Sequence, residues 1–149
     1  SGEIGVLVMG LGTGGSATGA GRFLKDQKPD LWLVGVDPEG SIYTAATESD
    51  VTTYLTEGVG EDFWPETFDP GLVDQYEMVT DAEAFSATRR LTTEEGIFAG
   101  GSSGMAVAGA LRVAVERPRD LVVVVLPDSG RNYISKIYND DWMRDNGFL

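Results

Sequence analysis

The chain has 149 residues, of which 42% are hydrophobic, and its formal net charge at pH 7 is −13. This composition suits one domain or a large part of one, and the negative charge disfavours binding to nucleic acid or to an anionic membrane surface. Because the sequence contains neither cysteine nor histidine, it excludes disulfides, thiolate nucleophiles, Ser-His-Asp triads and most zinc and iron sites.

The first forty residues predict a βαβ unit. Residues 4–9 form a continuous apolar run, which is typical of a strand buried on both faces. A glycine-rich turn follows at residues 10–16, and a helix is expected from there to about Lys28, because Pro29 stops it. Residues 31–36 predict a second strand, joined to the first by a right-handed crossover.

The stretch of residues 37–71 has weak periodicity and many turn-forming residues. We expect loops there, with one short helix around residues 41–47. Residues 75–79 predict a strand, and the next helix should begin directly after it. Thr80 and Glu83 match a capping box, in which each residue satisfies a free backbone N–H of the other.

The last third of the chain alternates turns, helices and one strand. The capped helix should run to about Glu95, and a second glycine-rich turn occupies residues 96–104. Residues 105–115 are apolar on nearly every face, which is typical of a buried helix. The valine-rich residues 121–126 predict a central parallel strand, and residues 133–149 predict one or two short helices.

These elements predict an α/β fold with a mostly parallel sheet in a three-layer αβα arrangement. Ligands of such sheets bind at the carboxyl ends of the strands. Polar, glycine-containing turns follow Met9, Ala99 and Leu126, so we expect these three turns to meet at one site. No basic segment leads an apolar one at the N-terminus and the apolar runs are short, so we expect a cytoplasmic protein.

The first glycine turn is compatible with three interpretations. Gly10, Gly12 and Gly15 fit the dinucleotide fingerprint, and Asp37 lies 22 residues beyond Gly15, near the spacing of a ribose-binding acid. The turn could instead hold another phosphate, or it could be a tight turn without a ligand. The hydroxyl groups of Thr13 and Ser16 favour a terminal phosphate monoester, which has several acceptor oxygens.

The second and third turns also have a structural and a functional interpretation. Ser102 or Ser103 could simply cap the following helix, or could present a hydroxyl group at the active edge of the sheet. Asp128 and Ser129 could bond to their own backbone in a turn, or could belong to the same site.

Five short motifs nevertheless occur together and in order, at residues 12–16, 35–41, 57–60, 100–102 and 127–133. In this combination the chain resembles the cysteine synthase/cystathionine β-synthase family of fold-type II pyridoxal-phosphate enzymes, which share the fold of the tryptophan synthase β subunit. The resemblance extends over residues 4–149 and implies that the chain is the C-terminal portion of such a catalytic core.

The resemblance implies a role for each matching position. The cofactor phosphate would lie on Gly12, Thr13, Gly14, Gly15 and Ser16, where Ser16 replaces the threonine usual in the family. Ser102 would face the pyridine nitrogen of pyridoxal 5'-phosphate, with Asp128 and Ser129 supporting the ring end of the pocket. Gly58 and Gly60 would lie beside the amino-acid substrate, together with Tyr133.

The family's reaction joins serine, or an O-activated serine, to a thiol. Residues 61–64 and 131–133 resemble the branch that uses homocysteine and forms cystathionine, and a cysteine synthase using sulfide is the alternative. The lysine that the family attaches to its cofactor does not match Lys25, Lys28 or Lys136. We therefore expect this chain alone to lack turnover, and we expect a homodimer because half of a core leaves apolar surface uncovered.

Overall fold

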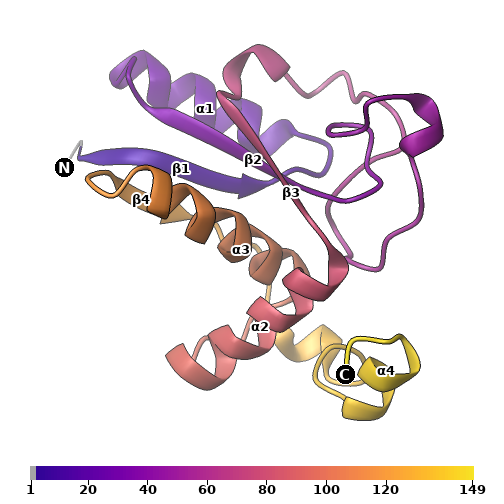
Figure 1. Cartoon of the computed structure of the whole chain (residues 1–149). Coiled ribbons are helices and arrows are strands. Elements are labelled where there is room, and N and C mark those ends of the chain that lie inside the picture. Colours follow the sequence, from indigo (N-terminus) through magenta and orange to yellow (C-terminus); the bar gives the residue numbers. More distant parts are fainter. Residues whose placement is uncertain (1–2) are drawn as a thin grey trace.

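Four parallel strands form one sheet in the computed structural model, which describes residues 3–149 (Figure 1). The strands are β1 (Ile4–Gly10), β2 (Trp32–Pro38), β3 (Gln75–Val79) and β4 (Leu121–Val124), in the order β3-β2-β1-β4. Because every neighbouring pair is parallel, the carboxyl ends of all four strands lie at the same edge of the sheet.

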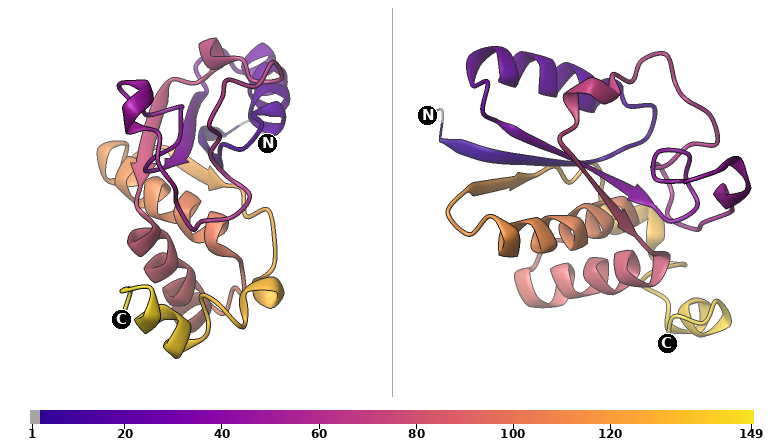
Figure 2. Two further views of the ribbon diagram at one scale, coloured as in Figure 1. Left: turned by 90° about the vertical axis from the view of Figure 1, so that its right-hand side faces the viewer. Right: turned by 45° about the horizontal axis from the view of Figure 1, so that its top comes forward.

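Helices cover both faces of this sheet, which confirms the αβα layering (Figure 2). Helix α1 (Gly15–Gln27) packs on one face, over Leu7 and Leu33. Helix α3 (Gly101–Glu116) covers the other face, and α2 (Asp81–Glu95) packs against α3. The apolar core is thereby divided into two clusters, one on each side of the strands.

The predicted limits of α2 are confirmed. The Thr80 hydroxyl accepts a hydrogen bond from the Glu83 N–H at 3.3 Å, and the Glu83 carboxylate accepts one from the Thr80 N–H at 2.9 Å. Gly96 closes the helix in the left-handed conformation, with φ of 71°. The C-terminal segment contains two short helices, η3 (Gly130–Tyr133) and α4 (Asp140–Asp145).

The prediction of a helix around residues 41–47 is wrong. The chain forms turns there, followed by two 3-10 helices, η1 (Glu48–Asp50) and η2 (Pro70–Leu72). The Ser41 hydroxyl donates to the Glu61 carbonyl at 3.3 Å and accepts from the Glu61 N–H at 3.1 Å. These hydrogen bonds hold the backbone in turns, as serine side chains commonly do outside helices.

The start of α3 and the position of β4 in the sheet also differ from the expectation. Helix α3 begins at Gly101 instead of residue 105, with Gly100 as its N-cap and no side-chain cap, so Ser102 and Ser103 lie inside its first turn. Strand β4 is an edge strand instead of a central one. Its apolar residues point alternately toward the core and toward solvent, an alternation that composition alone does not indicate. Within residues 3–149, no helix is long and apolar enough to cross a membrane.

Candidate phosphate site at the carboxyl edge of the sheet

A cavity of ≈ 220 Å³ lies where β1 leads into α1. Its lining comes from the β1–α1 turn, from the segment around Gly58 and from the chain that leaves β4. The lining residues are Met9, Gly10, Gly12, Thr13, Gly14, Gly15, Ser16, Ala17, Gly58, Val59, Val125 and Pro127. The first and third of the predicted turns therefore meet here, as expected from their positions after β1 and β4.

The cup, which we define as residues 12–16, presents backbone donors without backbone partners. Within the described residues, no N–H of the cup donates to another backbone group. Gly14 is the N-cap of α1, with φ of 75° and no side-chain cap, and its carbonyl accepts from the Thr18 N–H at 2.9 Å. Consecutive free N–H groups at a helix N-terminus make a site for an anion.

Gly58 lines the cavity together with the cup. A methyl group placed on Gly12 would be 3.1 Å from the Gly58 carbonyl oxygen, so the two backbones approach closely. Gly60 does not line the cavity, but its N–H donates to the Leu11 carbonyl at 2.6 Å and fixes this loop to the end of β1. Lys136 forms an ion pair with Glu57, which holds the other side of the loop.

The cavity is not lined by Ser102, Asp128, Ser129 or Tyr133. Ser102 is 4% exposed, and its carbonyl oxygen would be 4.0 Å from a methyl group on Gly10. The second turn therefore lies next to the first. The predicted contacts of Ser102, Asp128, Ser129 and Tyr133 with a ring stay predictions.

Asp128 connects the end of β4 to the start of α3. Its carboxylate accepts from the Gly100 N–H at 3.1 Å, from the Ser103 hydroxyl at 3.5 Å and from the Tyr133 hydroxyl at 2.7 Å. Burial and the hydrogen bond to Asp128 raise the pKa of Tyr133 above its ordinary value, so its hydroxyl remains a donor. The Ser129 side chain accepts from the Arg131 N–H at 3.4 Å and caps η3.

Asp37 does not have the position that the dinucleotide interpretation requires. Its side chain is fully buried, and one carboxylate oxygen accepts from the Thr44 hydroxyl at 2.8 Å. It does not line the cavity next to the cup. A ribose hydroxyl could not reach this carboxylate without displacing the turn around Thr44, so the dinucleotide interpretation is not favoured.

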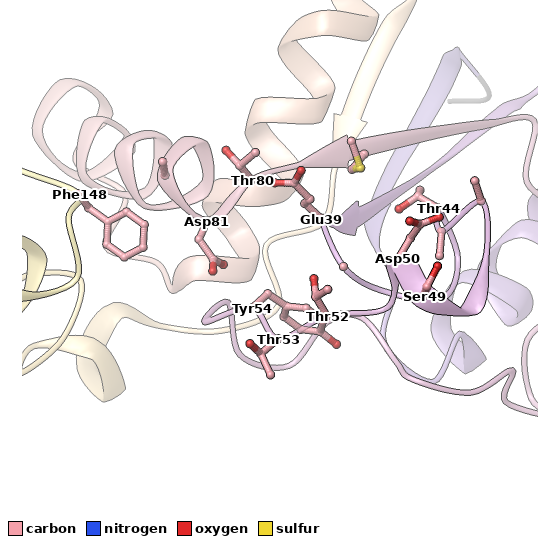
Figure 3. Close-up of a pocket in the computed structure, with 15 residues that line it drawn as sticks. Glu39, Thr44, Ser49, Asp50, Thr52, Thr53, Tyr54, Thr80, Asp81 and Phe148 are labelled. Atoms are coloured by element: carbon pink, nitrogen blue, oxygen red, sulfur yellow. The ribbon is translucent and has the colours of Figure 1, made fainter.

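A larger cavity, of ≈ 670 Å³, lies between the turns after β2 and the start of α2 (Figure 3). Its lining includes the carboxylates of Glu39, Asp50 and Asp81, and no lysine or arginine of the described chain lines it. The Asp81 carboxylate already accepts from the Leu55 N–H at 2.6 Å and the Thr56 N–H at 2.9 Å. Three carboxylates repel an anion, so the smaller cavity is the better phosphate site.

The three lysines of the chain do not line the cavity beside the cup. The Lys25 ammonium group lies 2.6 Å from Asp74, that of Lys28 lies 2.9 Å from Asp30, and Lys136 is paired with Glu57. Each of them is therefore engaged with a carboxylate.

Comparison with known proteins gives a family and several relatives. The model of the family described as "Pyridoxal-phosphate dependent enzyme" matches residues 1–128. Cystathionine beta-synthase from Oryctolagus cuniculus is 46% identical to this chain, and the match covers 99% of this chain and 28% of the relative. Cystathionine beta-synthase from Dictyostelium discoideum is 45% identical, and the match covers 99% of this chain and 30% of the relative. The chain thus spans less than a third of these relatives.

A solved structure has the same fold. It is the O-acetylserine dependent cystathionine beta-synthase from Helicobacter pylori, with a TM-score of 0.86 and 36% sequence identity. The similarity covers 93% of this chain and 45% of the Helicobacter pylori chain.

Proposed function

Because this chain belongs to the family of pyridoxal-phosphate dependent enzymes, we propose that its cup binds the phosphate of pyridoxal 5'-phosphate. The observation that carries the proposal is the run of five N–H groups without backbone partners, next to the hydroxyl groups of Thr13 and Ser16. We also propose that the chain is the C-terminal portion of a larger catalytic core, since it spans 28–30% of the cystathionine beta-synthases named above.

The chemistry of the cup suits a phosphate monoester. Thr13 and Ser16 are exposed and can donate hydrogen bonds, and the positive end of the α1 dipole lies at the cup. The described residues that line the cavity include no carboxylate, although the whole chain is strongly acidic. Local donors therefore outweigh the unfavourable net charge at this position.

The ring of the cofactor would extend from the cup toward the first turn of α3. When bound, pyridoxal phosphate supplies an electron sink for reactions at an amino acid. Ser102 would place a neutral hydroxyl at the ring nitrogen, where it does not protonate the ring as a carboxylic acid would. A neutral hydroxyl group at the ring nitrogen suits β-elimination and β-replacement better than transamination. Asp128 would act by holding Gly100 and Ser103, and hence the start of α3.

We propose that the complete protein condenses serine, or an O-activated serine, with homocysteine to form cystathionine. Gly58, Gly60 and Tyr133 would border the substrate, with Gly58 closest to the cup. The names of the relatives support cystathionine formation, and the O-acetylserine dependence of the Helicobacter pylori enzyme supports an O-activated serine for that protein. The cysteine synthase alternative has no comparable support. The cytoplasmic location and the homodimer stay predictions.

We further propose that none of the three lysines of this chain carries the cofactor. Lys25 and Lys28 lie at the far end of α1 from the cup, and Lys136 is held by Glu57. The lysine required by the family's chemistry would then come from the rest of the catalytic core.

Binding measurements with this chain test the phosphate site. Pyridoxal 5'-phosphate and inorganic phosphate should raise the melting temperature, whereas pyridoxal and NAD should have little effect. Removing the cup hydroxyls in a Thr13→Val, Ser16→Ala variant should weaken phosphate binding about tenfold or more, because hydrogen bonds to a charged group are lost. Thr93→Val, on an exposed position of α2, is the matched control.

Two results would contradict these proposals. Equal binding of pyridoxal and pyridoxal 5'-phosphate would show that the cup does not recognise phosphate. Borohydride treatment in the presence of the cofactor, followed by mass spectrometry of peptides, should leave all three lysines unmodified. Stoichiometric modification of one of them would overturn the assignment of the lysine to another part of the core.

A further inference from the structure

Two side chains outside the cavity bind the carbonyl oxygens of the cup. The Tyr43 hydroxyl donates to the Gly12 carbonyl at 2.6 Å, and the Thr67 hydroxyl donates to the Thr13 carbonyl at 2.6 Å. Neither Tyr43 nor Thr67 lines the cavity, so both carbonyls are held by residues outside it. Both residues come from the long segment between β2 and β3, in which the sequence motifs marked only Gly58 and Gly60 as site residues.

The orientation of these two carbonyls determines the orientation of two donors. A trans peptide is planar, so its C=O and N–H point in opposite directions. A hydrogen bond on the Gly12 carbonyl therefore fixes the Thr13 N–H, and one on the Thr13 carbonyl fixes the Gly14 N–H. Rotation of either peptide would replace a donor in the cup by a carbonyl oxygen, which repels an anion.

Glycine makes such a rotation accessible in this loop. Gly12 and Gly14 flank Thr13, and glycine adopts positive and negative φ at similar cost. The carbonyls on either side are fixed by the backbone itself, that of Leu11 by the Gly60 N–H and that of Gly14 by the Thr18 N–H. Only the two peptides between them depend on side chains for their orientation.

Tyr43 is itself held firmly. It is 7% exposed, and its ring packs edge-on against Phe68 and Trp64, with centroid distances of 4.8 Å and 5.2 Å. The hydrogen bond from Thr44 to Asp37 fixes the adjoining residue. Burial raises the pKa of Tyr43 above its ordinary value, so its hydroxyl keeps the proton that it donates.

Thr67 is positioned by the residues that follow it. Phe68 lies directly against the backbone of Gly14, so that a methyl group on Gly14 would collide with its ring. The Asp69 N–H donates to the Thr18 hydroxyl at 2.9 Å, which attaches the segment to the first turn of α1. The Thr67 hydroxyl is thus brought to the cup by a packed segment, although its own residue is exposed.

We propose that Tyr43 and Thr67 are positioning residues that lock the peptides 12–13 and 13–14 with their N–H groups toward the phosphate. This inference rests on the proposed phosphate site and extends it to two residues behind the cup. They touch neither substrate nor cofactor, and they act only through the backbone of Gly12 and Thr13.

The test uses Tyr43→Phe and Thr67→Val, which remove the hydroxyl groups and keep the packing. Without ligand, amide hydrogen exchange in the peptide covering residues 10–18 should become faster in both variants, because a mobile cup loosens the hydrogen bonds of the Leu11 N–H and the Thr18 N–H at its two ends. The affinity for inorganic phosphate and for pyridoxal 5'-phosphate should fall about tenfold for each lost hydrogen bond. Thr67→Ser keeps a hydroxyl and should restore both properties.

Tyr138→Phe is the matched control, because the Tyr138 hydroxyl also donates to a backbone carbonyl, that of Ala99, at 2.6 Å. It should lower stability without changing exchange or phosphate affinity at the cup. Unchanged exchange and affinity in Tyr43→Phe and Thr67→Val would overturn the positioning role. If exchange becomes faster in those variants but the wild-type chain binds neither phosphate compound, the phosphate site itself is overturned instead.

Discussion

Asp37 is a buried carboxyl group with an incomplete set of partners. One of its oxygens accepts from Thr44, and the other has no hydrogen-bond partner among the described residues. Burial raises its pKa from 3.8 to about 6, although the hydrogen bond from Thr44 opposes the rise. Folding therefore favours the protonated form relative to the unfolded chain, and because Asp37 is mostly ionised at neutral pH, its ionisation there opposes folding.

The sign of this effect predicts a pH dependence. Because the folded pKa lies above the unfolded one, the contribution of Asp37 to stability is complete below about pH 4 and is lost as the pH rises through about 6. Relative to Asp37→Asn, the free energy of unfolding of the wild type should thus fall by about 2 kcal/mol between pH 4 and pH 7. Urea unfolding at several pH values measures this difference. Asp26→Asn, at an exposed position of α1, should show no such trend.

At the scale of elements, α1 depends on the conformation of its first residues. Gly14 has φ of 75° and packs against Phe68, whereas Gly19 lies in the exposed interior of α1, where an added methyl group would have no atom within 4 Å. Gly14→Ala should therefore destabilise the fold by about 2–4 kcal/mol and abolish phosphate binding. Gly19→Ala should stabilise it by about 0.5–1 kcal/mol. Chemical unfolding measures the stability of both variants. A Gly14→Ala variant as stable as the wild type would refute the packing of Phe68 on the cup.

Local signals account for the elements that the sequence predicted well. The capping box of Thr80 and Glu83 and the terminal Gly96 act within a few residues, so they mark the ends of α2 reliably. The position of β4 at the sheet edge depends on which strands it pairs with, which its valines do not reveal. Similarly, the cup could be predicted from its glycines, but Tyr43 and Thr67 lie 31 and 54 residues from their partners and follow no local pattern.

At the scale of the whole molecule, the two faces of the sheet are covered unequally. Four strands span about 19 Å, whereas one helix with its side chains is about 10–12 Å wide. Helix α1 packs over β1 and β2, so the same face of β4 receives little cover. Leu121 and Val123 are consequently 55% and 39% exposed, on an edge strand with unpaired backbone groups.

This uncovered edge predicts self-association. Burying Leu121 and Val123 against a second copy would remove apolar surface from water and cover the edge, so the mass in solution should exceed 15.9 kDa and rise with concentration. A Leu121→Lys, Val123→Lys variant should shift the chain toward the monomer, because it would place charges on that edge. Val115→Lys, on α3 at a residue that is 81% exposed, should leave the mass unchanged. Sedimentation velocity distinguishes these outcomes, and a wild-type chain that stays monomeric at all concentrations would exclude β4 as the contact in the expected homodimer.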